Sequence, residues 1–175
     1  MLGIGALRTI CIAAMVPLAW GIATQRADST YAPLLRYQGI WHMGNAGGVS
    51  EELVNRCNRI GRYFACEQTV DGKLEGLVVY IPAKVSGHYY TQAITAEGRA
   101  SGRSELTIDG ETWIYSGTGE KDEQGFSHRT VNIFNGEDRI HYEQQRSSDD
   151  KTWTTTSSGD EVRVSKTASA PRKRQ

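Results

Sequence analysis

Residues 54–70, with the sequence VNRCNRIGRYFACEQTV, decide the fold that we expect for this chain of 175 residues. Gly61 and Arg62 lie at the centre, and glycine at the first position of a two-residue loop is typical of a type II′ hairpin turn. Pairing residues outward from that loop places Cys57 opposite Cys66, at a non-hydrogen-bonded position where Cα atoms lie about 4.5 Å apart. A disulfide spans this distance. The segment therefore predicts a β-hairpin closed by a Cys57–Cys66 disulfide, with two separate buried thiols as the alternative.

The first 23 residues have the plan of a cleaved signal peptide. Arg8 precedes an apolar run at 9–23 that ends in small residues. The run has about 15 residues, fewer than the roughly 20 that a helix needs to cross a bilayer, so a retained membrane anchor is the weaker interpretation. We expect cleavage after Ala23, with Ala27 as the second choice. Removal of Cys11 with this segment leaves an even pair of cysteines, which suits a periplasmic or secreted protein.

Composition limits the partners and the number of domains. Twenty basic residues balance twenty acidic residues, so the chain has no general attraction to nucleic acid or to an anionic membrane surface. We divide it into the signal peptide at 1–23, a flexible N-terminal segment at 24–34, one domain at 35–166, and a disordered basic tail at 167–175. The sequence leaves the oligomeric state open.

Short segments of alternating apolar and polar residues follow one another through the domain. Asp-Gly at 71–72 and 109–110 and Asn-Gly at 135–136 separate several of them, and such dipeptides are strong hairpin signals. Gly102 and the Gly159–Asp160 pair are expected to interrupt the chain similarly. The expected strands cover residues 39–43, 54–60, 63–70, 74–81, 88–95, 104–108, 112–116, 129–134, 139–145, 152–156 and 162–165.

These strands predict an all-β fold. An open sheet of about ten strands would leave two exposed edges, whereas closure into a barrel removes them. We therefore expect an antiparallel up-and-down β-barrel of about 8–10 strands. One helical turn is expected before the first strand, at 33–37, because Pro33 suits a first helical position.

Two segments at the ends of the domain resemble the lipocalins and the wider calycin group. In that group a Gly-x-Trp motif opens the first strand, its Trp plugs one end of the barrel, and an Arg of the last strand lies across the indole ring. Gly39-Ile40-Trp41 matches the motif, and Arg163 in the Glu-Val-Arg-Val segment at 161–164 matches the Arg. The resemblance implies that Trp41 and Arg163 are structural partners.

The region 35–166 also resembles a family of uncharacterised bacterial lipocalin-like domains. The matching stretches are the cysteine hairpin, Trp-Ile-Tyr at 113–115, Asp-Arg-Ile at 138–140 and Ser-Asp-Asp-Lys-Thr-Trp at 148–153. The chain departs from the haem-binding branch of related barrels, because His42-Met43-Gly44 replaces the glycines that follow the Trp there, and no histidine occurs after His141. We therefore expect no haem and no other cofactor.

The resemblance implies an exported barrel that binds a small, partly apolar or aromatic ligand. Even an eight-stranded barrel leaves space for one small guest. The residues expected to line such a space are the aromatic side chains Tyr80, Tyr90, Trp113, Tyr115 and Tyr142, with Arg129 and His141 as polar contacts.

No residue pattern supports catalysis or metal binding. The four histidines lack the short spacing of zinc sites, and no serine lies in a Gly-x-Ser-x-Gly turn. We accordingly name no catalytic or metal-binding residue.

Two other functions remain open. The loop from Ser86 to Tyr89 resembles the loop that certain exported barrels insert into lysozyme, which would make the protein a periplasmic inhibitor. A hydrolase or isomerase on the same barrel is the third hypothesis. A hollow interior would favour ligand binding, a filled barrel with a protruding loop would favour inhibition, and two titratable groups meeting in a pocket would favour catalysis.

Overall fold

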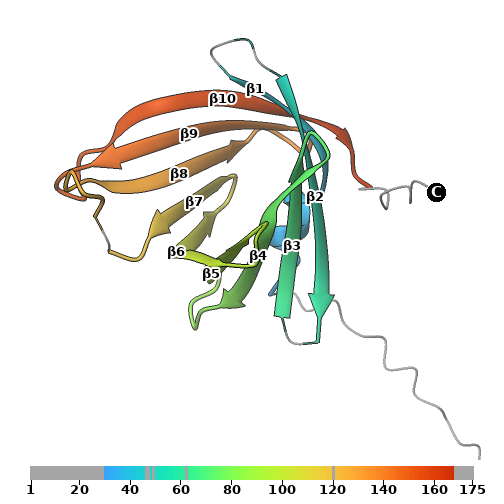
Figure 1. The fold of residues 1–175 in the computed structure, drawn as a ribbon, viewed down its shortest axis with the longest axis horizontal. Coiled ribbons are helices and arrows are strands. Elements are labelled where there is room, and N and C mark those ends of the chain that lie inside the picture. Colours follow the sequence, from blue (N-terminus) through green and yellow to red (C-terminus); the bar gives the residue numbers. More distant parts are fainter. Residues whose placement is uncertain (1–29, 46–47, 49, 62, 120, 168–175) are drawn as a thin grey trace, which may run out of the picture.

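The protein folds as a closed barrel of ten antiparallel strands, which confirms the fold class expected from the sequence (Figure 1). The computed structural model describes residues 30–45, 48, 50–61, 63–119 and 121–167. The strands are β1 (Gly39–Asn45), β2 (Ser50–Ile60), β3 (Tyr63–Val70), β4 (Lys73–Pro82), β5 (His88–Thr95), β6 (Ala100–Asp109), β7 (Thr112–Gly117), β8 (Ser127–Phe134), β9 (Arg139–Ser147) and β10 (Thr154–Ser165).

Each strand pairs with its neighbour in sequence, and β10 pairs with β1 to close the barrel (Figure 1). Closure gives every strand a hydrogen-bonding partner on both sides, so no edge is left open to another chain. Successive side chains alternate between the interior and the outer surface. This alternation decides which residues lie in the interior.

The hairpin of β2 and β3 has the predicted register. Ile60 is opposite Tyr63, Cys57 is opposite Cys66, and the cysteines form a disulfide with their Cα atoms 4.0 Å apart. Gly61 has a φ of +62°, which a primed hairpin turn requires. The predicted type II′ geometry also depends on Arg62, which lies outside the described residues.

Two glycines expected to interrupt strands lie inside them instead. Gly102 belongs to β6, and Gly159 belongs to a single strand, β10, that joins the two segments expected at 152–156 and 162–165. A Cβ at Gly159 would lie 2.2 Å from the carbonyl oxygen of Gly44 and 2.7 Å from the hydroxyl of Tyr142. Gly159 therefore permits close approach of strands, and the expected turn there was wrong.

A short 3-10 helix, η1 (Pro33–Tyr37), closes one end of the barrel, at the expected helical turn. Leu34 and Tyr31 are buried, and the Tyr31 ring stacks on Phe64 of β3 with centroids 5.3 Å apart. The packed body therefore begins by Tyr31, so the expected flexible segment at 24–34 is wrong for its last residues.

Trp41 and Arg163 meet at this closed end, as the resemblance implies. Trp41 is fully buried, and the Arg163 guanidinium carbon lies 4.0 Å from the centre of its ring. The Trp41 indole N–H donates to the carbonyl of Tyr37 at 3.0 Å, which ties η1 to β1. Tyr37 in turn packs against Trp113 and Phe134, with ring centroids 6.4 Å apart in each case.

The expected signal peptide lies outside the described residues, as does most of the expected basic tail, 168–175. In the described part of the chain, no helix is long and apolar enough to cross a membrane.

Candidate functional site

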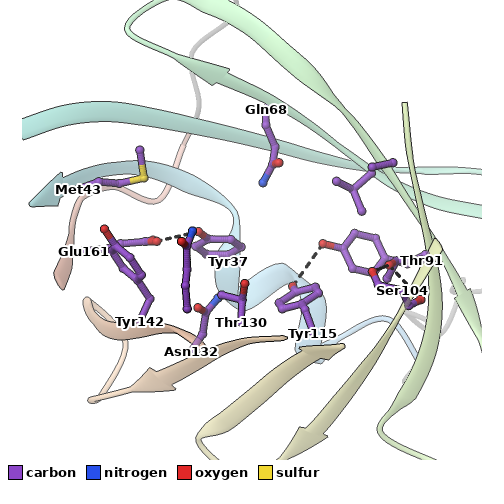
Figure 2. A pocket seen from close by; sticks show the side chains of 14 residues that line it. Tyr37, Met43, Gln68, Thr91, Ser104, Tyr115, Thr130, Asn132, Tyr142 and Glu161 are labelled. Carbon is purple, nitrogen blue, oxygen red and sulfur yellow. Dashed lines mark hydrogen bonds between the residues drawn. The ribbon is translucent and has the colours of Figure 1, made fainter. Parts of the chain in front are cut away.

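The barrel interior holds a cavity of about 440 Å³ above the plug formed by η1 (Figure 2). Its lining changes from buried to exposed along the barrel. Glu161 and Asn132 are buried, Met43 and Thr130 are partly exposed, and Gln144 is exposed. The cavity therefore extends from the closed end toward the opposite mouth.

Eleven of the fourteen side chains that line the cavity carry a polar group, although apolar atoms form the larger part of its surface. The wall contains four tyrosines, one carboxylate, three amides and three hydroxyl side chains, together with three apolar side chains. The lining residues are Tyr37, Tyr80, Tyr115, Tyr142, Glu161, Gln68, Asn132, Gln144, Thr91, Ser104, Thr130, Met43, Val78 and Ala93. The wall thus combines aromatic faces with hydrogen-bonding groups from nine strands and η1.

Glu161 is the charged group of this wall. It is only 4% exposed, and its Oε1 accepts a hydrogen bond from the Tyr37 hydroxyl at 3.0 Å (Figure 2). Its Oε2 is buried and has no hydrogen-bond partner among the described residues. Burial raises the pKa of Glu161 from 4.5 to about 7, although the Tyr37 hydrogen bond opposes this shift.

The tyrosine hydroxyls form a second polar group in the cavity. The hydroxyls of Tyr80 and Tyr115 lie 3.4 Å apart (Figure 2). Burial raises the pKa of Tyr80, and burial together with Tyr80 raises the pKa of Tyr115 well above its ordinary value. Tyr37 behaves likewise, because burial and the charge of Glu161 both raise its pKa. These phenols therefore stay neutral near pH 7 and can donate or accept hydrogen bonds.

Three of the expected ligand-binding residues line the cavity: Tyr80, Tyr115 and Tyr142. Trp113 instead belongs to the closed-end core, with its ring 4.7 Å from that of Phe134. Tyr90 is 51% exposed on the outer surface of β5. The expected positions of Trp113 and Tyr90 in the cavity wall were therefore wrong.

The two expected polar contacts also lie elsewhere. The Arg129 guanidinium stacks on Trp153 at 4.1 Å and donates to Gln145 at 2.6 Å. It lines an adjoining depression that shares Ser104, Tyr115, Thr130 and Gln144 with the cavity. The His141 ring pairs with Asp160 at 2.9 Å on the outer face. Side chains alternate between the two faces of β8 and β9. Thr130 and Tyr142 face inward, so the residues before them, Arg129 and His141, face away from the cavity.

Sequence reasoning missed the most buried polar groups of the site, above all Glu161, Tyr37 and Asn132. For Glu161 a signal was present. Residues two apart on a strand share a face, so placing Arg163 against Trp41 also places Glu161 inside the barrel. Tyr37 had no such signal, because it lies in a short helix.

No family model and no curated protein matches this chain. Among the described residues, no group of three or more histidine, cysteine, aspartate or glutamate side chains is placed to hold a metal ion.

Proposed function

We propose that this protein is an exported, lipocalin-like barrel that binds a small molecule in its interior cavity. One observation carries the proposal: the interior is hollow, with a volume of about 440 Å³ beside a plugged end. Ligand pockets usually measure about 300–1,000 Å³ and combine apolar walls with a few convergent polar groups. This cavity has both features.

The wall favours a guest with hydrogen-bonding groups as well as an aromatic or apolar part. Tyrosine rings offer flat apolar faces, while Gln68, Asn132 and Glu161 offer donors and acceptors. The ligand expected from the sequence was partly apolar or aromatic, with Arg129 as one polar contact. We now expect its polar part to meet amides, phenols and a carboxylate.

A cavity-filling substitution with a matched control tests the proposal. Val78 lines the cavity, and the next residue, Val79, faces the opposite side of β4. A compound library is first screened by thermal shift, because a ligand that binds only the folded state raises the unfolding midpoint. Val78→Phe should abolish the stabilisation by cavity ligands, whereas Val79→Phe should retain it. Absence of any stabilising compound, or equal binding by both variants and the unmodified protein, would overturn the proposal.

A second candidate is catalysis of proton transfer, because two titratable groups meet in the cavity. The Tyr37 hydroxyl contacts Glu161, and a carboxyl with a pKa of about 7 is suited to general acid–base chemistry near neutral pH. Bound compounds should then exchange a carbon-bound proton for solvent deuterium, and Glu161→Gln should stop the exchange without abolishing binding. If the bound compounds are recovered without deuterium, the proton-transfer function is contradicted and ligand binding remains as the proposed function.

The inhibitor hypothesis gains no comparable support. The backbone N–H of Ile108 in β6 donates to the carbonyl of Gly87 at 2.7 Å, and Ala83 donates to the carbonyl of His88 at 2.9 Å. The loop from Ser86 to Tyr89 is thus tied to the barrel, and the barrel is hollow. Both observations favour the cavity over this loop as the functional site.

Export to the periplasm or the medium is also part of the proposal. The Cys57–Cys66 disulfide supports an oxidising compartment, and the expected signal peptide supplies the route. Mass spectrometry of the protein from its native compartment should give a chain that begins near Thr24 and resists alkylation until it is reduced. A retained amino terminus or a freely alkylated Cys57 or Cys66 would contradict export by this route.

A further inference from the structure

We propose that the cavity selects an organic cation, whose ammonium or guanidinium group binds the free oxygen of Glu161. This inference rests on the proposed ligand-binding function and names the chemical class of the ligand. It is carried by three features of the cavity: an unpartnered acceptor, the absence of a protein cation from the wall, and a set of neutral aromatic rings.

The unpartnered acceptor is Oε2 of Glu161. The side chain is 4% exposed and lies in the wall of the cavity (Figure 2). Tyr37 hydrogen-bonds to Oε1, while Oε2 is buried without a partner in the described part of the chain. Nearly all buried polar atoms in folded proteins are hydrogen-bonded, so a donor supplied by a ligand would satisfy this oxygen.

The charge balance of the wall explains why that donor should be a cation. None of the described residues that line the cavity is a lysine, arginine or histidine. Nearby basic groups have other partners: His141 pairs with Asp160 on the outer surface, and Arg163 lies over Trp41. Arg129 and His128 line an adjoining depression, where Arg129 stacks on Trp153 and His128 pairs with Asp122. A buried carboxylate is costly without a compensating charge, and a ligand cation supplies one.

The rings around Glu161 suit the same kind of guest. Tyr37, Tyr80, Tyr115 and Tyr142 come from η1, β4, β7 and β9, and all four contribute to the wall. A cation over a tyrosine face is attracted by the ring quadrupole, more strongly where water is excluded. Because burial raises the pKa of each of these tyrosines, none adds a negative charge near pH 7 that would compete with Glu161.

A neutral donor would also satisfy Oε2, so the experiment must separate charge from hydrogen bonding. Charge-assisted hydrogen bonds are roughly twice as strong as neutral ones. Three probes of similar shape differ mainly in charge: 2-phenylethylamine, 2-phenylethanol and 3-phenylpropanoate. Calorimetric titration should show the amine binding at least about tenfold more tightly than the alcohol, and the carboxylate binding least.

Glu161→Gln and its neighbour Asp160→Asn form the variant pair. The amide keeps the size of Glu161 but removes the negative charge, so binding of the amine should fall at least about tenfold while binding of the alcohol changes little. Asp160 faces outward on the same strand and pairs with His141, so Asp160→Asn should leave both affinities unchanged. Equal losses for the amine and the alcohol in Glu161→Gln would contradict the assignment.

The pH dependence of the unmodified protein gives a second measurement that needs no variant. The titratable groups that line the cavity are Glu161 and the four tyrosines, with His141, Asp160 and Glu143 on the outer faces of β9 and β10. With a pKa of about 7, Glu161 is about 1% ionised at pH 5 and about 90% at pH 8. Binding of the amine should therefore strengthen between these pH values by at least about eightfold when the charge contributes tenfold, and by nearly 100-fold when only the ionised carboxylate binds it, whereas binding of the alcohol should stay flat.

The outcomes separate failure of this inference from failure of the proposed function. If the alcohol binds and Val78→Phe blocks it, but the amine binds no better at any pH, the cavity binds ligands and the cation selectivity is wrong. If no probe and no library compound binds, both proposals fall. Preferential, pH-dependent binding of the amine that is lost in Glu161→Gln supports both.

Discussion

The guanidinium of Arg163 connects three parts of the closed end of the barrel. It lies over the Trp41 ring, donates to the backbone carbonyls of Arg36 and Gln38 at the end of η1, and pairs with Asp138 at 3.1 Å. The last carbonyls of a helix have no partner within the helix, so these bonds cap η1. A single side chain thereby fixes the plug on the first and last strands.

Arg163→Ala should therefore lower the free energy of unfolding by about 2–4 kcal/mol, because it removes a cation–π contact and several charged hydrogen bonds. Arg163→Lys keeps the charge but not the planar fork, so its loss should be intermediate. Denaturant unfolding followed by circular dichroism measures both. Cavity ligands should keep their affinity, since Arg163 does not line the cavity. An unchanged unfolding midpoint in Arg163→Ala would refute the structural role.

Glu161 should give the stability of the protein an unusual pH dependence. Its pKa rises from 4.5 to about 7 on folding, so the folded chain holds a proton that the unfolded chain releases between these values. Stability therefore falls as pH rises through this window, by about 3 kcal/mol for this residue, and levels off above it. Relative to the unmodified protein, Glu161→Gln should become more stable by about that amount between pH 4.5 and pH 8.

Glu143 provides a control of opposite sign. Hydrogen bonds from Gln145 and Thr155 lower the pKa of Glu143, so its contribution to stability is present above its unfolded pKa and is lost as pH falls through the lower, folded value. Glu143→Gln should thus lose stability relative to the unmodified protein as pH rises. Parallel pH profiles for the two variants would mean that burial of Glu161 has no effect on its titration.

At the scale of elements, Gly159 is the position where β10 and β1 approach closely. A side chain there would meet the carbonyl of Gly44 and the ring of Tyr142. Gly159→Ala should therefore cost more than about 2 kcal/mol and displace Tyr142 from the cavity wall. Gly102→Ala is the control, because Gly102 also lies within a strand but has open space around its Cα. It should be neutral or slightly stabilising. Thermal unfolding compares the two variants. Equal unfolding midpoints for Gly159→Ala and Gly102→Ala would show that β1 and β10 can move apart without loss of stability.

The same glycines show where sequence reasoning about elements succeeds and fails. Asp-Gly and Asn-Gly between alternating segments located the β3–β4, β6–β7 and β8–β9 connections. The glycine of each pair has a positive φ, as does Asp71 in the first pair. Gly102 and Gly159 also lie between alternating segments, but in the structure they are inside strands β6 and β10 and do not form turns. Whether a glycine turns the chain or admits a neighbouring strand depends on that strand, which a local sequence pattern does not contain.

At the scale of the whole molecule, the sequence predicted the barrel better than its interior. Hairpins are specified locally, so about ten short strands in succession indicated a closed meander. To assign the inward face of a strand, the position of one of its residues must be known. The expected contact between Arg163 and Trp41 gives that position for β10 and places Glu161 inside the barrel. Arg129 and His141 were instead chosen for their chemistry, and both lie outside the cavity. Tyr37 follows no strand alternation, so only the folded chain places it beside Glu161.

The plug formed by η1 joins strands from around the barrel. Tyr37 packs against Trp113 of β7 and Phe134 of β8, and its carbonyl accepts hydrogen bonds from Trp41 of β1 and Asn55 of β2. A barrel has no central element of its own, so its end depends on such contacts to stay closed. We expect the plug and the strands to unfold together as one cooperative unit.

Two adjacent leucines of η1 test this dependence. Leu34 is 1% exposed within the core, whereas Leu35 is 47% exposed, so the same truncation in the same helix removes very different contacts. Leu34→Ala should lower the free energy of unfolding by about 2–5 kcal/mol, because the packed surroundings only partly refill the space. Leu35→Ala should stay within about 0.5 kcal/mol. Near-ultraviolet circular dichroism reports the buried aromatic rings of the plug, and far-ultraviolet circular dichroism reports the strands. For each variant, the two signals should give the same unfolding midpoint. Separate midpoints in Leu34→Ala would show instead that the barrel holds its shape with the plug released, and that η1 closes the end without stabilising the strands.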